Sequence, residues 1–188
     1  MTKTSSRIWK RLKRRLVYTN PWMTVYEDEV QLPNDHQTIY GFMEPKNEFV
    51  GIVPLLSAEE VLLIRQYRYL QDEVTWEIPS GAIDNEETPK LAAQRELQEE
   101  VGYKAGQLQL INIMRSNKSL MRDKGYIFLA QGLVPAKAKH DITEEFEIIS
   151  ITLSKAIEMI KQYEITDCVS IIGLLLATEH QKMKPSTS

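Results

Sequence analysis

Cysteine is almost absent from this chain, and no long apolar run is present. Among 188 residues there is one cysteine, Cys168, which cannot form an internal disulfide, so nothing calls for an oxidising compartment. The longest apolar stretch, Ile171 to Ala177, is far shorter than the ~20 residues of a membrane helix. No apolar segment of signal-peptide type follows the basic start. We therefore expect a soluble, cytoplasmic protein without a membrane partner.

Acidic residues are missing from the first 26 positions, although acids outnumber bases in the whole chain. These positions hold seven Lys/Arg, so the remainder carries a net charge of −10 against −3 overall. Three interpretations stay open for RIWKRLKRRLVY: a transit peptide, a nucleic-acid-binding arm, or a solvated strand or helix. In the last and favoured case, its apolar members pack against the domain or a second subunit. The acidic body argues against nucleic acid as a partner. The apolar members are Ile8, Trp9, Leu12 and Leu16.

Short runs of β-branched and aromatic residues fill the chain from position 16 to 78. Runs such as FVGIVPLL, VLLIRQYRYL and EVTWEI predict strands, as do LQLINIM, GYIFLAQGL and FEIISITL further on. A turn is predicted at Pro79-Ser80-Gly81, and a loop from Gly81 to Glu87. Helices are predicted after Thr88, an N-cap followed by proline, and at about 154–163 and 167–180. This order indicates an α/β domain, with a mixed sheet covered by helices.

Three glutamates crowd the last turn of the first predicted helix, which ends at Gly102. Glu96 shares a helix face with Glu99 and Glu100, so each like-charged pair costs roughly 0.2–0.5 kcal/mol, and all three oppose the helix dipole. One interpretation is a solvated face whose repulsion Arg95 and salt soften. The other is a divalent cation held by the carboxylates, and such hard oxygen ligands suit Mg²⁺ or Mn²⁺.

The spacing around these acids resembles the Nudix box, the signature of the Nudix hydrolases. Gly81 is followed after five residues by Glu87, and after seven more by RELQEEVGY, residues 95–103. Tyr103 stands where an aliphatic residue is commonest. The stretches LIRQYRYL, TWEIPSGAID and YEITDCVSIIGLLLA resemble those of the ADP-ribose and nucleotide-sugar pyrophosphatase branch. The resemblance therefore covers about residues 16 to 180.

A metal platform is the first implication of this resemblance. Glu96 and Glu100 would be the principal ligands of Mg²⁺, with Mn²⁺ as an alternative. Glu99 would support a further ion or a catalytic water, and the main-chain carbonyl of Ser80 would complete the ligand set. The resemblance assigns structural roles within the motif to four residues: Gly81, Glu87, Arg95 and Gly102.

Substrate binding and proton transfer are implied for residues outside the box. Arg65 and Arg68 would hold phosphates, and Glu77 would lie beside the substrate. A loop matching HDITEEFEI would supply a general base or outer metal ligand. Glu144 ranks ahead of Glu145 there, because Glu145 should share a strand face with the residue two positions later. Trp22 and Tyr40 would stack on the base.

The resemblance implies a Nudix fold, a mixed sheet sandwiched between helices, with an N-terminal antiparallel β extension. We expect residues 1–50 to form this extension and a homodimer contact, 51–182 the hydrolase domain, and 183–188 a flexible tail. The expected activity is hydrolysis of ADP-ribose to AMP and ribose 5-phosphate. The region RSNKSLMRDKG lacks the proline common in ADP-ribose-specific members, which leaves GDP-mannose or another nucleotide sugar as an alternative. A non-catalytic nucleotide-binding protein is the alternative of another class.

Overall fold

Two compact units make up the chain, and each is considered by itself. The computed structural model describes residues 8–137 and 147–183. The first unit comprises the described residues up to Glu48 together with Arg115–Asp123. The second comprises Phe49–Met114 and the described residues from Lys124 onward. The expected division at positions 50/51 and 182/183 stays a prediction.

Three antiparallel strands form the sheet of the first unit, in the order β1-β2-β3. They are β1 (Lys10–Thr19), β2 (Met23–Gln31) and β3 (Gln37–Pro45). The basic segment is thus a strand, and its charges are partly matched across the sheet. Arg14 donates two hydrogen bonds to Asp28, of 2.7 and 2.8 Å, and this pairing lowers the pKa of Asp28.

The apolar residues of this segment remain partly or largely exposed in the single chain, although the ring of Trp9 meets that of Tyr40 edge-on. Ile8, Trp9, Leu12 and Leu16 are all exposed, with between 41% and 72% of each residue accessible. The reason is that β1 is an edge strand, paired only with β2 in this sheet. The alternative, packing against a second subunit, stays a prediction.

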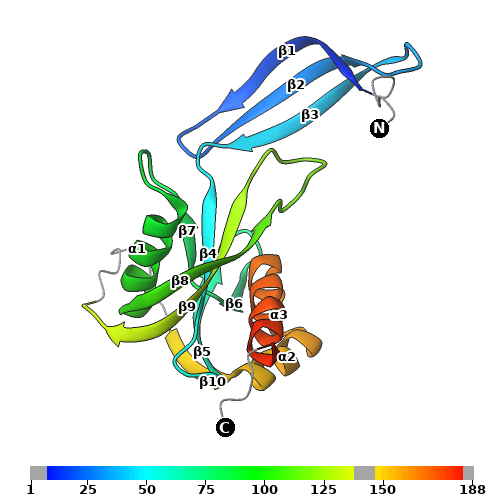
Figure 1. The fold of residues 1–188 in the computed structure, drawn as a ribbon. Coiled ribbons are helices and arrows are strands. Elements are labelled where there is room, and N and C mark those ends of the chain that lie inside the picture. The colour runs from blue at the N-terminus through cyan, green and yellow to red at the C-terminus, as the bar shows by residue number, and fades with distance from the viewer. Residues whose placement is uncertain (1–7, 138–146, 184–188) are drawn as a thin grey trace. The chain divides into compact units, whose positions relative to one another are not determined.

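The second unit contains two sheets and three helices (Figure 1). One sheet has the order β7-β4-β9-β8 and is mixed, since β4 pairs parallel with β9 and antiparallel with β7. The other has the order β10-β5-β6 and is antiparallel. The elements are β4 (Phe49–Pro54), β5 (Glu60–Arg68), β6 (Glu73–Glu77), β7 (Ser80–Ala82), α1 (Pro89–Val101), β8 (Tyr103–Met114), β9 (Gly125–Pro135), β10 (Glu147–Thr152), α2 (Leu153–Lys161) and α3 (Cys168–Lys182).

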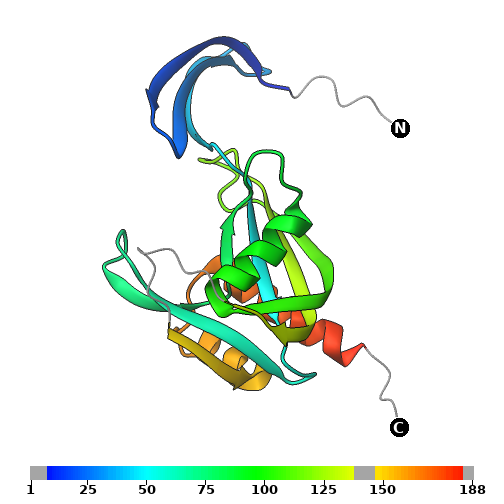
Figure 2. The same cartoon turned by 90° about the vertical axis from the view of Figure 1, so that its left-hand side faces the viewer.

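Helices cover both faces of the mixed sheet. Figures 1 and 2 show α1 and α3 on opposite sides of β4 and β9. Along β4, Val50 and Ile52 join the cluster under α1, whereas Val53 joins the cluster under α3. This alternation buries both faces of one strand, as its near-continuous apolar sequence requires. The predicted mixed sheet between helices is confirmed.

Two elements, β7 and β8, differ from the prediction by more than a shift of one or two residues at an end. Ser80–Ala82 forms β7 rather than a turn and loop, because β4 supplies a pairing partner that local sequence does not reveal. Strand β8 begins at Tyr103, five residues before the predicted LQLINIM, because Tyr103 to Ala105 pair with the end of β9. In the described ranges, no helix has the length and apolar character needed to cross a membrane.

Candidate active site

Helix α1 carries the crowded glutamates, and both of its ends are fixed by local contacts. The Thr88 hydroxyl accepts a hydrogen bond from the backbone N–H of Leu91 at 3.3 Å, as an N-cap does. Gly102 adopts the left-handed conformation, with φ of 72°, and its N–H donates to carbonyls of the last turn. These caps confirm the predicted start and stop of the helix, and they hold its last turn beside β7.

Gly81 on β7 lies directly against the carboxylate of Glu96. A Cβ atom at this position would come within 2.0 Å of Glu96 Oε1. Only a residue without a side chain leaves room for the carboxylate here. The side chain of Glu96 is 12% exposed in this position. The backbone of β7 and the helix therefore form one closely packed site.

Glu100 is almost fully buried, although it is an acidic residue, and it is 4% exposed. Its Oε2 accepts a hydrogen bond from the backbone N–H of Ser80 at 2.9 Å. A buried carboxylate needs such partners, because burying it unpaired costs far more than the roughly 2–7 kcal/mol of an unpaired amide or hydroxyl. The structure thus brings together Ser80, Gly81, Glu96 and Glu100, as the sequence predicts.

Arg95 holds the opposite charge among these acids. Its guanidinium donates to Glu87 at 3.2 and 3.0 Å, to Glu96 at 2.7 Å and to Glu99 at 3.0 Å. A further bond of 2.8 Å reaches the carbonyl of Ala82. The predicted pair of Glu87 and Arg95 is present. Hydrogen bonding to Glu87 is the main cause of the raised pKa of Arg95, and the same bonds lower the pKa of Glu87.

The donor set at the end of α1 fits a hard divalent cation. Three carboxylates and the backbone of Ser80 and Gly81 supply oxygen ligands of the kind that Mg²⁺ and Mn²⁺ prefer. Within the described ranges, no three acidic, histidine or cysteine side chains converge on one point. The reason is that Glu96 and Glu99 reach Arg95, while Glu100 reaches Ser80.

Arg68 and Glu77 form a second charged pair in the same unit. Arg68 Nε donates to Glu77 Oε1 at 2.8 Å, and a second bond joins Nη2 to Oε2. The Thr75 hydroxyl also donates to this carboxylate. Burial acts to raise the pKa of Glu77, but the bonds from Arg68 and Thr75 outweigh it, so this pKa is lowered.

The surroundings of Arg68 connect this pair with the acidic end of α1. Hydrogen bonding to Glu77 is the main cause of the raised pKa of Arg68, and the charges of Asp167 and Glu100 raise this pKa further. Arg68 also lines a cavity of about 390 Å³ with Thr75, Glu77 and Asp167. Arg68 is therefore a cation at a cavity within electrostatic reach of Glu100.

Arg65 does not share this position. It lies three residues before Arg68 on β5, so the two side chains leave opposite faces of the strand. Its guanidinium pairs with Glu147 at 3.1 Å and lies 5.3 Å from the centre of the Trp76 ring. The structure thus separates the two predicted phosphate ligands.

Thr75 and Asp167 are among the residues at this cavity that sequence reasoning missed. Thr75 bonds to Glu77, and Asp167, the N-cap of α3, lies in the same lining. The spacing of two between Thr75 and Glu77 in a predicted strand was a signal that they share a face. No local signal places the start of α3 there.

The predicted base-stacking residues lie in the first unit. Trp22 is 76% exposed just before β2. The hydroxyl of Tyr40 on β3 donates a hydrogen bond of 2.7 Å to the carbonyl of Ser119. The rings of Tyr40 and Trp9 pack edge-on, with their centroids 5.8 Å apart. Glu144 and Glu145, the predicted loop acids, lie outside the described residues.

Comparisons with known proteins identify the family. The NUDIX domain matches residues 45–164, and the nucleoside diphosphate sugar hydrolase N-terminal domain matches residues 9–43. The chain is 26% identical to a methanol dehydrogenase activator of Bacillus methanolicus, covering 88% of this chain and 90% of that protein. It is 24% identical to an ADP-ribose pyrophosphatase of Bacillus subtilis, covering 84% and 86% respectively.

A solved structure agrees with these matches over nearly the whole length. The crystal structure of an ADP compounds hydrolase has a TM-score of 0.87 and 25% identity, and the match covers 96% of this chain and 97% of that chain. Because the NUDIX domain spans more than half of the sequence, and the box residues meet in space at β7 and α1, the assignment is secure at the level of family. The chain belongs to the Nudix hydrolase family, and it is a Nudix pyrophosphatase, an enzyme that hydrolyses phosphoanhydrides.

Proposed function

We propose that this protein is a Mg²⁺-dependent enzyme that hydrolyses the diphosphate of a nucleoside diphosphate sugar, with ADP-ribose as the leading substrate. Its products would be AMP and ribose 5-phosphate. The observation that carries this proposal is the approach of Glu96 and Glu100 to the backbone of Gly81 and Ser80. This arrangement keeps three glutamates on the last turn of one helix, although their mutual repulsion disfavours that spacing.

Glu96, Glu99 and Glu100 would hold the ion, with the Ser80 carbonyl beside them. A bound Mg²⁺ or Mn²⁺ would neutralise phosphate charge and lower the pKa of a water molecule. Arg95 already touches Glu96 and Glu99, so binding of the ion would require these carboxylates to turn away from its guanidinium. Arg95 would then stay in place through its two bonds to Glu87 and its bond to the carbonyl of Ala82.

Arg68 would hold a phosphate of the substrate, and Arg65 stays a second candidate. The guanidinium of Arg68 lines a cavity and is 40% exposed, so it can donate to an anion while Glu77 keeps it in place. Glu77 would then act by positioning Arg68, because its own oxygens are engaged by Arg68 and Thr75.

The chemical step would be attack of a water oxygen on one phosphorus of the diphosphate. The bond from this phosphorus to the bridging oxygen breaks, and the water proton passes to a carboxylate. Glu144, ahead of Glu145, is our proposal for this general base, and Glu99 could serve through a bound water. Replacing Glu144 and Glu145 by glutamine one at a time tests the assignment. The base is the position whose loss lowers kcat at saturating substrate.

Two rival functions lead to a direct comparison. A GDP-mannose or other nucleotide-sugar pyrophosphatase would use the same acids and differ only in the organic half. A non-catalytic nucleotide-binding protein would leave the crowding of Glu96, Glu99 and Glu100 unexplained. Turnover of ADP-ribose and GDP-mannose by the pure protein, with Mg²⁺, Mn²⁺ and excess EDTA, separates the three. We expect metal-dependent release of AMP, abolished by EDTA, at a higher kcat/KM than release of GMP.

The assembly and location of the protein are also proposals. The apolar side chains exposed on the β1–β3 sheet support a homodimer through the first unit. Trp22 and Tyr40 lie in this unit, where they would stack on the base. We also propose a cytoplasmic location, with nucleic acid and membrane playing no part.

A further inference from the structure

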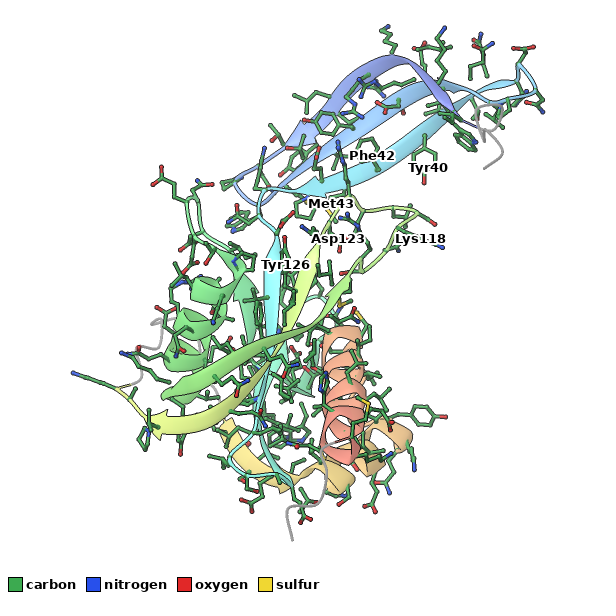
Figure 3. All side chains as sticks on the ribbon, in the orientation of Figure 1. Tyr40, Phe42, Met43, Lys118, Asp123 and Tyr126 are labelled. Atoms are coloured by element: carbon green, nitrogen blue, oxygen red, sulfur yellow. The ribbon has the colours of Figure 1, made fainter. Side chains whose placement is uncertain are left out.

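The first unit contains a cavity that includes none of the proposed metal ligands, although Tyr40, which we propose to stack on the base, forms part of its wall. It has a volume of about 340 Å³ and lies between β3 and the segment Arg115–Asp123. This size is at the lower end of small-molecule sites. In Figure 3, Tyr40 and Phe42 project from β3 toward the segment that carries Lys118. The lining used below consists of Tyr40, Phe42, Arg115, Lys118, Met121 and Arg122.

Cations dominate the polar part of this lining. Arg115, Lys118 and Arg122 contribute three positive charges, and no carboxylate belongs to the lining. Lys118 forms no hydrogen bond or ion pair within the described part of the chain. Arg122 approaches Glu44 only at 3.5 Å, with its side chain 66% exposed, and such a pair contributes little. Two of the three cations are therefore available to a ligand.

Hydrogen bonds within the unit hold the cavity open in one shape. The backbone N–H of Met43 donates to Leu120, and that of Arg122 donates to Met43, both at 2.8 Å, so the segment pairs with β3. Tyr40 is tied to the same segment through Ser119. The two ends of the segment are joined because the buried Asp123 accepts from the N–H of Ser116 at 2.9 Å.

Arg115 is held at the base of the same segment. Its guanidinium donates through Nη1 to the backbone carbonyl of Asp123. This partner is a carbonyl oxygen, and the remaining N–H groups of the planar guanidinium suit a phosphate or carboxylate. The cations therefore belong to a formed site rather than to a solvated basic loop.

We propose that this cavity binds a small organic molecule carrying a phosphomonoester, such as a sugar phosphate or a nucleoside monophosphate. Three cations match the charge of about −2 that a phosphomonoester carries near neutral pH. Tyr40, Phe42 and Met121 supply the apolar surface that the organic part would cover. A cavity of this size accommodates one such group, whereas a nucleic-acid strand would need an extended basic groove.

Binding without divalent metal tests this proposal. Calorimetry of the full chain in EDTA would compare ribose 5-phosphate with ribose, AMP with adenosine, and inorganic phosphate alone. EDTA keeps the carboxylates of α1 from contributing, so the result does not depend on the hydrolytic activity. We expect at least one phosphorylated compound to bind and its unphosphorylated counterpart not to bind.

A matched pair of double variants locates the site. Lys118→Gln with Arg122→Gln should weaken binding roughly tenfold or more, because two charge-assisted contacts are lost. Lys155→Gln with Lys161→Gln removes the same charge from exposed positions of α2 and should leave affinity unchanged. Equal loss in both variants, unchanged affinity in both, or no preference for the phosphorylated compounds would overturn the proposal.

Kinetics distinguishes two sources of the phosphorylated group. If it belongs to the enzyme's own substrate or product, the variant at Lys118 and Arg122 raises KM for the substrate. If it belongs to a separate metabolite, KM is unchanged and only the response to added ribose 5-phosphate or AMP is lost. Both results support the cavity as a phosphate site, and a variant with normal KM and normal response to both compounds contradicts it.

Discussion

At the acidic end of α1, each of the three glutamate carboxylates contacts a different neighbour. Glu96 meets the bare backbone of Gly81, Glu100 meets the N–H of Ser80, and Glu99 meets Arg95. The bonds from Arg95 and from the N–H of Ser80 lower the cost of holding like charges together before any ion is bound. The arrangement is thus prepared by the protein rather than created by the metal.

Gly81→Ala should damage activity more than stability. The added methyl group would meet the far end of the flexible Glu96 side chain, which can move, and the φ of Gly81 is not in the left-handed region. We expect the melting temperature to change little while kcat falls roughly tenfold or more, since a metal ligand is displaced. Gly41→Ala is the control, because its methyl group would meet nothing within 4 Å. Normal Mg²⁺-dependent turnover by Gly81→Ala would refute this reading of the contact.

Glu77→Gln should change the acid dependence of stability. The pKa of Glu77 in the folded protein lies below its usual value of 4.5, so the folded state binds fewer protons there than the unfolded state. The folding stability that the Glu77 carboxylate contributes is therefore present above about pH 5 and is lost as the pH falls below the usual pKa of 4.5. Urea unfolding from pH 3 to 7 should show a wild-type advantage that shrinks on acidification. A stability advantage of the wild type that grows as the pH falls would contradict this prediction.

Motif spacing predicted the residues of the box but not the partners outside it. Gly81, Glu87 and Arg95 are recognisable because their distances along the chain are fixed by one strand and one helix. The pairing of Arg68 with Glu77 depends on the register between β5 and β6, which is a tertiary property. The resemblance therefore implied that both lie near the substrate without showing that they bind each other.

At the scale of secondary structure, α1 was the most predictable element. An N-cap, a proline at the first position and a terminal glycine are local signals, and all three are used as expected. Strand β7 has only three residues and contains glycine, so its sequence carries no strand signal. It exists because β4 offers an edge, and no local pattern contains that information.

Gly102→Ala should destabilise α1 at its C-terminal end. With φ of 72°, alanine would adopt a left-handed conformation at a cost of about 1–2 kcal/mol. Differential scanning calorimetry should show a melting temperature lower by roughly 2–6 °C. Gly102→Asn should lose less, because asparagine tolerates this conformation. Equal losses for alanine and asparagine would mean that the backbone conformation is not the cause.

At the scale of the whole molecule, the first unit leaves large apolar side chains in solvent. Leu16, Trp22 and Ile39 are between 56% and 76% exposed on or beside its three-stranded sheet. Exposed apolar surface of this kind commonly marks a protein contact. The resemblance implied this N-terminal β extension, while the basic sequence of β1 left strand and helix open. The partner of the sheet could not be predicted, since the required complementarity lies in another molecule.

Sedimentation tests the proposed homodimer. The chain of 21.7 kDa should sediment at about twice this mass, and Leu16→Glu should shift it toward the monomer by placing a charge in the contact. Leu70→Glu is the control, because Leu70 is 87% exposed in the hairpin between β5 and β6. A wild-type protein that sediments only as a monomer at high concentration contradicts the proposal.

The most direct test of the whole account is the turnover of ADP-ribose by Glu100→Gln in the presence of Mg²⁺. Glutamine keeps the size of the side chain and an acceptor oxygen for the N–H of Ser80, so the fold should remain intact by circular dichroism. Removing the charge of a principal metal ligand should lower kcat by ~100-fold or more. The account predicts this loss in a folded protein. Mg²⁺-dependent turnover at the wild-type rate in this variant would contradict it.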